Sequence, residues 1–165
     1  MSRPVPDPAG PGQESVWNFP RPSIAQPVTA NVRIVLAGKT IAETRQAIRT
    51  IETSHPPTYY IPPCDITPHV LRPAAGSSFC EWKGTARYFD VIGGDLVRPG
   101  AAWSYPYPTP PFVALADYVA FYAAPMDACF VDDERATPQP GGFYGGWITS
   151  HVVGPFKGVT GSRGW

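Results

Sequence analysis

The feature that most limits this fold is the density of residues that interrupt regular secondary structure. The 165 residues include 22 prolines and 16 glycines, roughly double the average usage. Proline removes a backbone donor and glycine raises the entropy cost of folding, so a chain interrupted this often cannot form a helical bundle or coiled coil. Because 43% of the residues are hydrophobic, we expect one small β-rich domain rather than a disordered chain.

The charges balance, with 13 Lys and Arg residues against 13 Asp and Glu residues. Proteins that bind nucleic acids normally carry a basic excess for the phosphate backbone, so we expect no nucleic-acid partner. No apolar run approaches the ~20 residues of a membrane span. The first twenty residues also lack the apolar run of a secretory signal, so we expect no membrane partner.

The cysteines are few and far apart. Cys64, Cys80 and Cys129 are an odd number at wide spacing, which argues against a disulfide framework. Reduced thiols are typical of cytoplasmic proteins, so we expect a cytoplasmic location. The chain has no Cys-x-x-Cys pair of the kind that structural zinc sites use, so we expect no metal ion and no cofactor. A mixed site of scattered cysteines and histidines is the alternative.

The composition divides the chain into three parts. Residues 1–29 are Pro-rich with almost no periodicity and predict an extended arm, in which Trp17 and Phe19 either pack on the core or contact a partner. Residues 30–134 predict the β domain. Residues 135–165 form a Gly/Pro-rich tail with too many large apolar side chains for a flexible linker. We expect the tail to pack on the domain or on a second copy, which would give a homo-oligomer.

Short alternating runs predict antiparallel hairpins. Residues 32–43 predict one hairpin, residues 93–95 a turn between two further strands, and residues 118–132 another hairpin. Residues 44–52 fit either a strand or a single helical turn, while the prolines and glycine in residues 67–78 predict a loop. Hairpins at short intervals with little helix predict an antiparallel sheet folded on itself.

The middle of the chain carries an ordered set of motifs. The most specific is the string Cys-x-x-Lys-Gly-x-Ala-x-Tyr at residues 80–88, and the others are Tyr59-Tyr60-Ile61-Pro62, Ala102-Trp103-Ser104-Tyr105-Pro106 and Val131-Asp132-Asp133-Glu134. Over about residues 30–134 this set resembles the family called domain of unknown function 427. The resemblance implies a compact antiparallel β-tent (Mss4-like) pair of sheets. It also brings a nucleotidyltransferase label, which would require Mg²⁺ held by clustered acidic residues. The acidic cluster at residues 132–134 is more typical of a solvated turn.

Two residues of the motif are candidates for catalysis. Cys80 precedes Lys83 by three residues, and a neighbouring cation favours the nucleophilic thiolate. In an extended strand the two side chains would point to opposite faces, so a turn, which Gly84 permits, is needed to bring them together. The alternatives are a buried, inert Cys80 and a Lys83 paired with Glu81 or Asp65.

Aromatic side chains in the same region suggest a ligand pocket. Tyrosine and tryptophan combine an apolar body with a polar tip and are often placed where a core meets a wet cleft. Filling the core of a small β domain is the alternative role for most of them. We select as ligand-binding candidates Arg45, Tyr60, Asp65, Trp82, Tyr88, Trp103 and Tyr105.

Three functions fit this sequence. The chain could be a small-molecule enzyme whose pocket holds Cys80, Lys83 and several aromatic rings, with a small-molecule ligand as its partner. It could instead be a non-catalytic binding module with an aromatic cage, or an oligomeric interaction protein that assembles through the tail.

Overall fold

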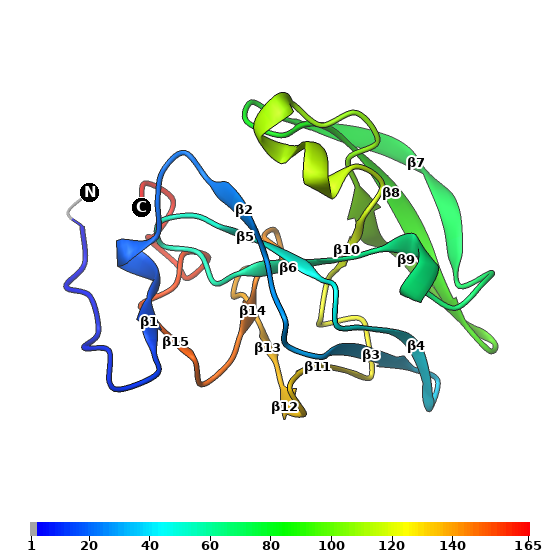
Figure 1. Ribbon diagram of the computed structural model, residues 1–165, viewed down its shortest axis with the longest axis horizontal. Coiled ribbons are helices and arrows are strands. Elements are labelled where there is room, and N and C mark those ends of the chain that lie inside the picture. Colours follow the sequence, from blue (N-terminus) through cyan, green and yellow to red (C-terminus); the bar gives the residue numbers. More distant parts are fainter. Residues whose placement is uncertain (1–2) are drawn as a thin grey trace.

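The computed structural model describes residues 3–165 and is mainly β, with antiparallel strands and almost no helix (Figure 1). Seven strands form the larger sheet, in the order β2-β5-β6-β10-β9-β8-β7. Their bounds, in chain order, are β2 Ile24–Pro27, β5 Ile48–Ile51, β6 Thr58–Ile61, β7 Leu71–Cys80, β8 Gly84–Gly93, β9 Leu96–Ser104 and β10 Val119–Phe121.

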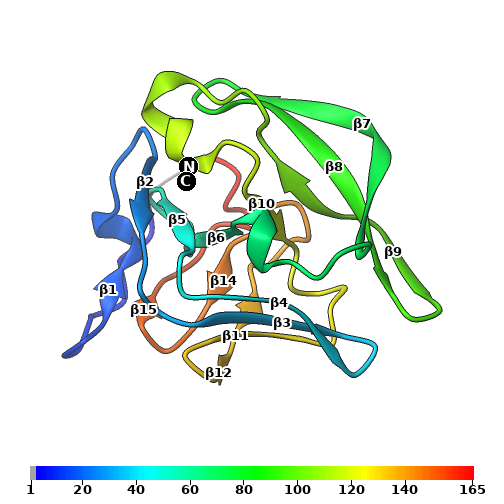
Figure 2. The same ribbon diagram turned by 45° about the vertical axis from the view of Figure 1, so that its right-hand side comes forward.

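Four strands form the second sheet, in the order β12-β11-β3-β4. They are β3 Val32–Leu36, β4 Lys39–Thr44, β11 Ala128–Val131 and β12 Glu134–Arg135. Figure 2 shows this sheet below the larger one. Short 3₁₀ helices and two-residue strand pairs complete the fold: η1 Val16–Asn18, η2 Pro63–Asp65, η3 Pro110–Leu115, β1 Glu14–Ser15 with β15 Val152–Val153, and β13 Thr137–Pro138 with β14 Trp147–Ile148. No helix within residues 3–165 is long and apolar enough to cross a membrane.

The main core lies between the two sheets. Strand β3 shows how the sequence builds it, because Val32, Ile34 and Leu36 are fully buried while Arg33 and Val35 between them are half-buried. This is the period of two that places alternate side chains on one face of a strand. Residues of β6, β9 and β10 face the same cluster.

Several sequence predictions are confirmed. Strands β3 and β4 form the hairpin predicted over residues 32–43, and β8 and β9 are joined at the turn predicted over residues 93–95. Residues 44–52 contain the strand β5 rather than a helical turn, because residues 48–51 pair with β2 and residues 48–50 also pair with β6.

Two local predictions are wrong. Residues 67–78 are not simply a loop, because β7 starts at residue 71. This strand has a neighbour on one side only, and its register shifts between Pro73 and Ser77, so an edge position and a bulge accommodate Pro73 and Gly76. Residues 118–132 do not form a hairpin, because β10 joins the seven-stranded sheet and β11 the four-stranded one.

Within residues 3–165, parts of both the arm and the tail pack on the domain. In the arm, Trp17 and Phe19 are buried in a small cluster with Val152 of the tail, and β1 pairs in parallel with β15. The larger sheet also takes its first strand, β2, from residues that we assigned to the arm. In the tail, Trp147 enters the main core and its indole Nε1 donates to the Phe121 carbonyl at 3.0 Å.

Candidate functional site

A cavity of about 360 Å³ lies between the seven-stranded sheet and the tail. This volume is typical of small-molecule sites. Its strand wall comes from residues before the tail and consists of Ser23, Thr50, Glu52, His55, Pro56, Thr58, Tyr60, Ser78, Phe79, Cys80, Lys83, Ala86, Tyr88, Trp103, Tyr105 and Tyr122. Its tail wall consists of Gln139, Phe143, Tyr144, Gly145 and Lys157. Other hollows of similar size lie nearby, and this one is distinguished by its reactive side chains.

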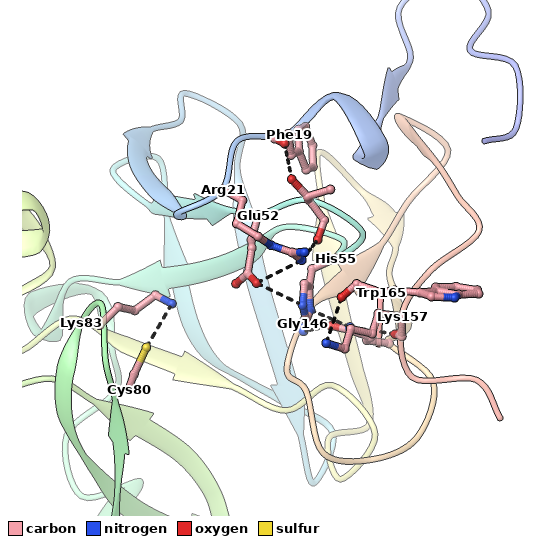
Figure 3. A network of polar contacts seen from close by, with 11 residues as sticks. Phe19, Arg21, Glu52, His55, Cys80, Lys83, Gly146, Lys157 and Trp165 are labelled. Carbon is pink, nitrogen blue, oxygen red and sulfur yellow. Dashed lines mark hydrogen bonds and ion pairs between the residues drawn. The ribbon is translucent and has the colours of Figure 1, made fainter. Parts of the chain in front are cut away.

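The turn between β7 and β8 brings the two predicted catalytic residues together. Cys80 is the last residue of β7 and pairs with Gly84, the first residue of β8, so residues 81–83 form the connecting turn. Gly84 adopts a φ of +111°, which L side chains rarely adopt. As a result Lys83 Nζ lies 4.0 Å from Cys80 Sγ (Figure 3). The turn that the sequence required for this pair is therefore present.

Lys83 has no carboxylate partner within ion-pair distance among residues 3–165. Neither Glu81 nor Asp65 takes this role. The Asp65 carboxylate accepts a hydrogen bond from the Thr44 hydroxyl at 2.6 Å instead. Besides Cys80, the ammonium lies 5.6 Å from the centre of the Phe112 ring. Lys83 therefore presents its charge to the cavity without a neutralising side chain.

A second set of polar side chains, Glu52 and His55, faces Cys80 and Lys83 across the cavity (Figure 3). Glu52 Oε2 lies 3.5 Å from His55 Nε2 and 3.5 Å from an Arg21 nitrogen. Arg21 also donates to the Thr53 carbonyl at 2.8 Å. Glu52 therefore pairs with Arg21 and His55.

Gln139 fixes which nitrogen of His55 carries the proton. Its Oε1 accepts from the Gly146 backbone N–H at 3.1 Å and its Nε2 donates to the Lys157 carbonyl at 2.9 Å, which sets the orientation of the amide. The second Nε2 proton then points to His55 Nδ1 at 3.0 Å. Because Nδ1 accepts, a neutral His55 carries its proton on Nε2, the nitrogen that lies 3.5 Å from Glu52 Oε2.

Burial shifts the pKa values of His55 and Glu52 in the direction that favours the neutral form of each side chain. The pKa of His55 falls to about 4, first because the ring is buried and then because Lys157, Arg21 and Lys83 repel a further positive charge. Burial also raises the pKa of Glu52, against the opposing effect of the same three cations. At neutral pH His55 is thus an uncharged donor, and Glu52 is a carboxyl group suited to proton transfer.

Aromatic rings enclose the rest of the cavity. The Trp103 and Tyr122 rings are 4.6 Å apart, and Gly145 lies so close that a Cβ there would be 2.0 Å from Trp103 Cη2. Only a glycine allows the tail to cover this ring. Burial raises the pKa values of Tyr60, Tyr105 and Tyr122, so their hydroxyl groups remain neutral at physiological pH.

The cavity gathers most of the residues that the sequence suggested, namely Cys80, Lys83, Tyr60, Tyr88, Trp103 and Tyr105. Three others lie elsewhere. Arg45 is exposed in the turn between β4 and β5, and Asp65 on η2 is held by Thr44. Trp82 is half-buried and packs against the small cluster that contains Phe112.

Sequence reasoning missed the tail wall and the pairing of Glu52 with His55. A signal was present for His55, because the segment His55-Pro56-Pro57 ends one strand and precedes the next, where side chains often point into a site. Gln139 and Lys157 gave no such signal, because nothing in the spacing of the tail indicates where it packs.

Among residues 3–165, no three His, Cys, Asp or Glu side chains gather as a metal-binding group. The acidic run at residues 132–134 forms a turn, in which Asp132 accepts from the Asn31 backbone N–H and Glu134 accepts from Ser150. These carboxylates thus serve in hydrogen bonds that join chain segments.

The fold and cavity define a small, mainly antiparallel β protein with a candidate small-molecule site. Residues 24–132 match the family described as domain of unknown function 427, and the chain belongs to this family. A comparison with curated proteins finds no match to the chain. The matched range includes Cys80 and Lys83 and ends before the tail wall.

Proposed function

We propose that this protein is a small-molecule enzyme that uses Cys80 as its nucleophile. The observation that carries the proposal is the 4.0 Å approach of Lys83 Nζ to Cys80 Sγ at the wall of an aromatic cavity. The ammonium group places a positive charge beside the proposed sulfur nucleophile, and the aromatic wall supplies an apolar surface for a substrate. The proposed ligand is a small molecule, and the three free cysteines fit a reducing compartment such as the cytoplasm.

The chemistry that these groups support best is acyl transfer. The Cys80 thiolate would form a bond to an acyl carbon while the bond from that carbon to the leaving group breaks. The leaving group would take a proton from the protonated form of Glu52, and water would then release the acyl group as an acid and restore the thiol. His55 would hold Glu52 in place through its Nε2 proton.

The proposal is tested by acylation of Cys80 with p-nitrophenyl acetate in a Cys64→Ser background. We expect a burst of p-nitrophenolate close to one equivalent, with the acetyl group located on Cys80 by peptide mass spectrometry. Cys129 is an internal control, because burial raises its pKa to about 12. Lys83→Gln should slow the burst several-fold, whereas Lys39→Gln, at the exposed β3–β4 turn, should not. Absence of acylation at Cys80 would refute the proposal.

A second candidate function, non-catalytic binding, is favoured by the ring pairs that surround the cavity, including Trp103 with Tyr122 and Tyr60 with Tyr105. Native mass spectrometry of the purified protein distinguishes the two functions. A binding module should retain a small molecule after Cys80→Ser and lose it after Trp103→Ala. An oligomeric role would instead appear in the same spectra as a multimer that depends on residues 135–165.

A further inference from the structure

The cavity and its immediate partners carry more positive than negative charge. Lys83 and Lys157 line it, Arg21 contacts it through Glu52, and Glu52 is the carboxylate of the wall. His55 adds no charge at neutral pH because its pKa is about 4. Since the whole chain has a formal net charge of zero, this local excess is a property of the site and not of the composition.

The three cations differ in how far the protein satisfies them. Arg21 contacts the Glu52 carboxylate and the Thr53 carbonyl. Lys157 donates to the Trp165 carbonyl at 3.2 Å and lies 5.5 Å from the centre of the Tyr144 ring. The Lys83 ammonium has the Cys80 sulfur as its only hydrogen-bond partner among the described residues, at 4.0 Å, the outer limit for such a contact. An ammonium has three donors, so Lys83 has donors available for a ligand.

The remaining wall is suited to a planar apolar body. Rings from β6, β8 and β9 and from the tail line the cavity, and the raised pKa values of Tyr60, Tyr105 and Tyr122 keep these side chains uncharged. Phe79 on the strand wall and Phe143 on the tail wall are about three-quarters exposed. An aromatic ligand that entered between the two walls could cover such apolar surface.

We propose that the ligand of this cavity is an aromatic or similarly planar small molecule with an anionic group, and that Lys83 binds the anion. This inference rests on the proposed function for the location of the site, but it makes a separate claim about the charge of the substrate. A neutral or cationic aromatic ligand would leave the Lys83 donors unsatisfied or would be repelled by them.

A matched pair of electrophiles tests the charge directly. The probes are 4-(bromomethyl)benzoate and 4-(bromomethyl)benzamide, which share a ring and a reactive carbon and differ in the carboxylate. In both, the Cys80 thiolate forms a thioether and bromide leaves. The measured quantity is the rate at which each probe alkylates Cys80 in a Cys64→Ser background. The rate of the benzoate probe is then divided by the rate of the benzamide probe. Each rate is divided by the rate of the same probe with 2-mercaptoethanol, a neutral thiol.

We expect the normalised ratio to be about tenfold at low ionic strength, the scale on which a charged cleft concentrates an anion, and to fall in 0.5 M salt. Lys83→Gln should bring the ratio to about one, while Lys83→Arg and Lys39→Gln should preserve it. Because both probes react with the same sulfur, a general loss of thiol reactivity in Lys83→Gln cancels from the ratio.

The outcomes separate this inference from the proposed function. A fast reaction of Cys80 with both probes at a ratio near one would support Cys80 as the nucleophile and would overturn the proposal that the substrate is anionic. A ratio that survives Lys83→Gln would overturn the assignment of the anion to Lys83. Failure of Cys80 to react faster than the buried Cys129 with either probe would refute the proposed nucleophile instead.

Discussion

The two walls of the cavity are held in place by different forces. The strand wall is fixed by backbone pairing in a seven-stranded sheet, in which β8 and β9 each have a neighbour on both sides. Near the tail wall the described residues form short pairings, namely β13 with β14, β1 with β15 and an isolated bridge between Lys157 and Val159. The tail wall is positioned mainly by the buried Trp147 and by the hydrogen bonds of Gln139.

This difference assigns separate tasks to the two walls. The groups that we propose for chemistry, Cys80, Lys83 and Glu52, lie on the strand wall, where Cys80 ends strand β7, Lys83 lies in the turn that follows it and Glu52 directly follows strand β5. The tail covers Trp103 through Gly145 and orients His55 through Gln139. A change in the tail should therefore alter closure and proton position before it alters the nucleophile.

The largest effect is expected when the tail loses its anchor. Trp147 is 1% exposed, and its indole donates to the Phe121 carbonyl. Trp147→Ala removes both the packing and this bond, and should lower the free energy of unfolding by about 3–5 kcal/mol in urea titration. Phe143→Ala, at a residue of the same wall that is 75% exposed, is the control and should change it by less than ~0.5 kcal/mol. Equal effects of the two variants would show that the tail is not anchored through the core.

An acid-sensitive loss of stability is expected from His55. In the unfolded chain this residue titrates near its ordinary pKa of 6.5, whereas in the folded protein burial and nearby cations lower the pKa to about 4. The unfolded state therefore binds the proton first, and stability falls as the pH drops from 6.5 to 4, by about 3 kcal/mol in total. The raised pKa of Glu52 acts in the opposite sense at the acidic end of this range.

The measurement is the free energy of unfolding at several pH values in the native protein and in His55→Gln. The variant should show a flatter curve between pH 6.5 and 4, while His69→Gln, at an exposed position, should keep the slope of the native protein. A curve unchanged by His55→Gln would mean that His55 is not buried as a neutral ring by the tail.

The strand wall and the tail wall also differ in how much of each could be predicted from the sequence. Alternation in residues 32–36 and the turn residues at 93–95 report local geometry, so these hairpins were predictable. The approach of Cys80 to Lys83 was also accessible, because it depends on a three-residue turn before a glycine. The partners of β10 and β11 could not be predicted, because the segment between these strands is short enough for a hairpin. In the structure β10 pairs instead with β6 and β9, and β11 pairs with β3, almost a hundred residues earlier in the chain.

The tail wall escaped prediction for a physical reason. Gln139 reaches His55 across 84 positions of sequence, and Lys157 reaches Gln139 through its backbone carbonyl, which every residue possesses. Such contacts leave no periodicity or motif. Asp65 and Arg45 do not line the cavity, because Asp65 accepts a hydrogen bond from Thr44 and Arg45 is exposed between β4 and β5.

A smaller and more specific effect is expected from Gln139, which joins the two walls. Gln139→Leu removes the donors to His55 Nδ1 and the Lys157 carbonyl and the acceptor for Gly146, and leaving such buried groups unpaired costs about 1–3 kcal/mol.

Gln139→Glu keeps the size but replaces the amide donor by an acceptor. His55 would then carry its proton on Nδ1, turn a bare Nε2 toward Glu52, and gain a nearby negative charge that favours the imidazolium. We therefore expect Gln139→Glu to raise the pKa of His55, measured by NMR titration of the ring. The rate at which iodoacetamide alkylates Cys80 should stay within about twofold of the rate in the native protein. This margin is far below the tenfold effect that corresponds to one pKa unit. A large drop in Cys80 reactivity would show that the tail also positions the nucleophile, and the separation between the walls would not hold.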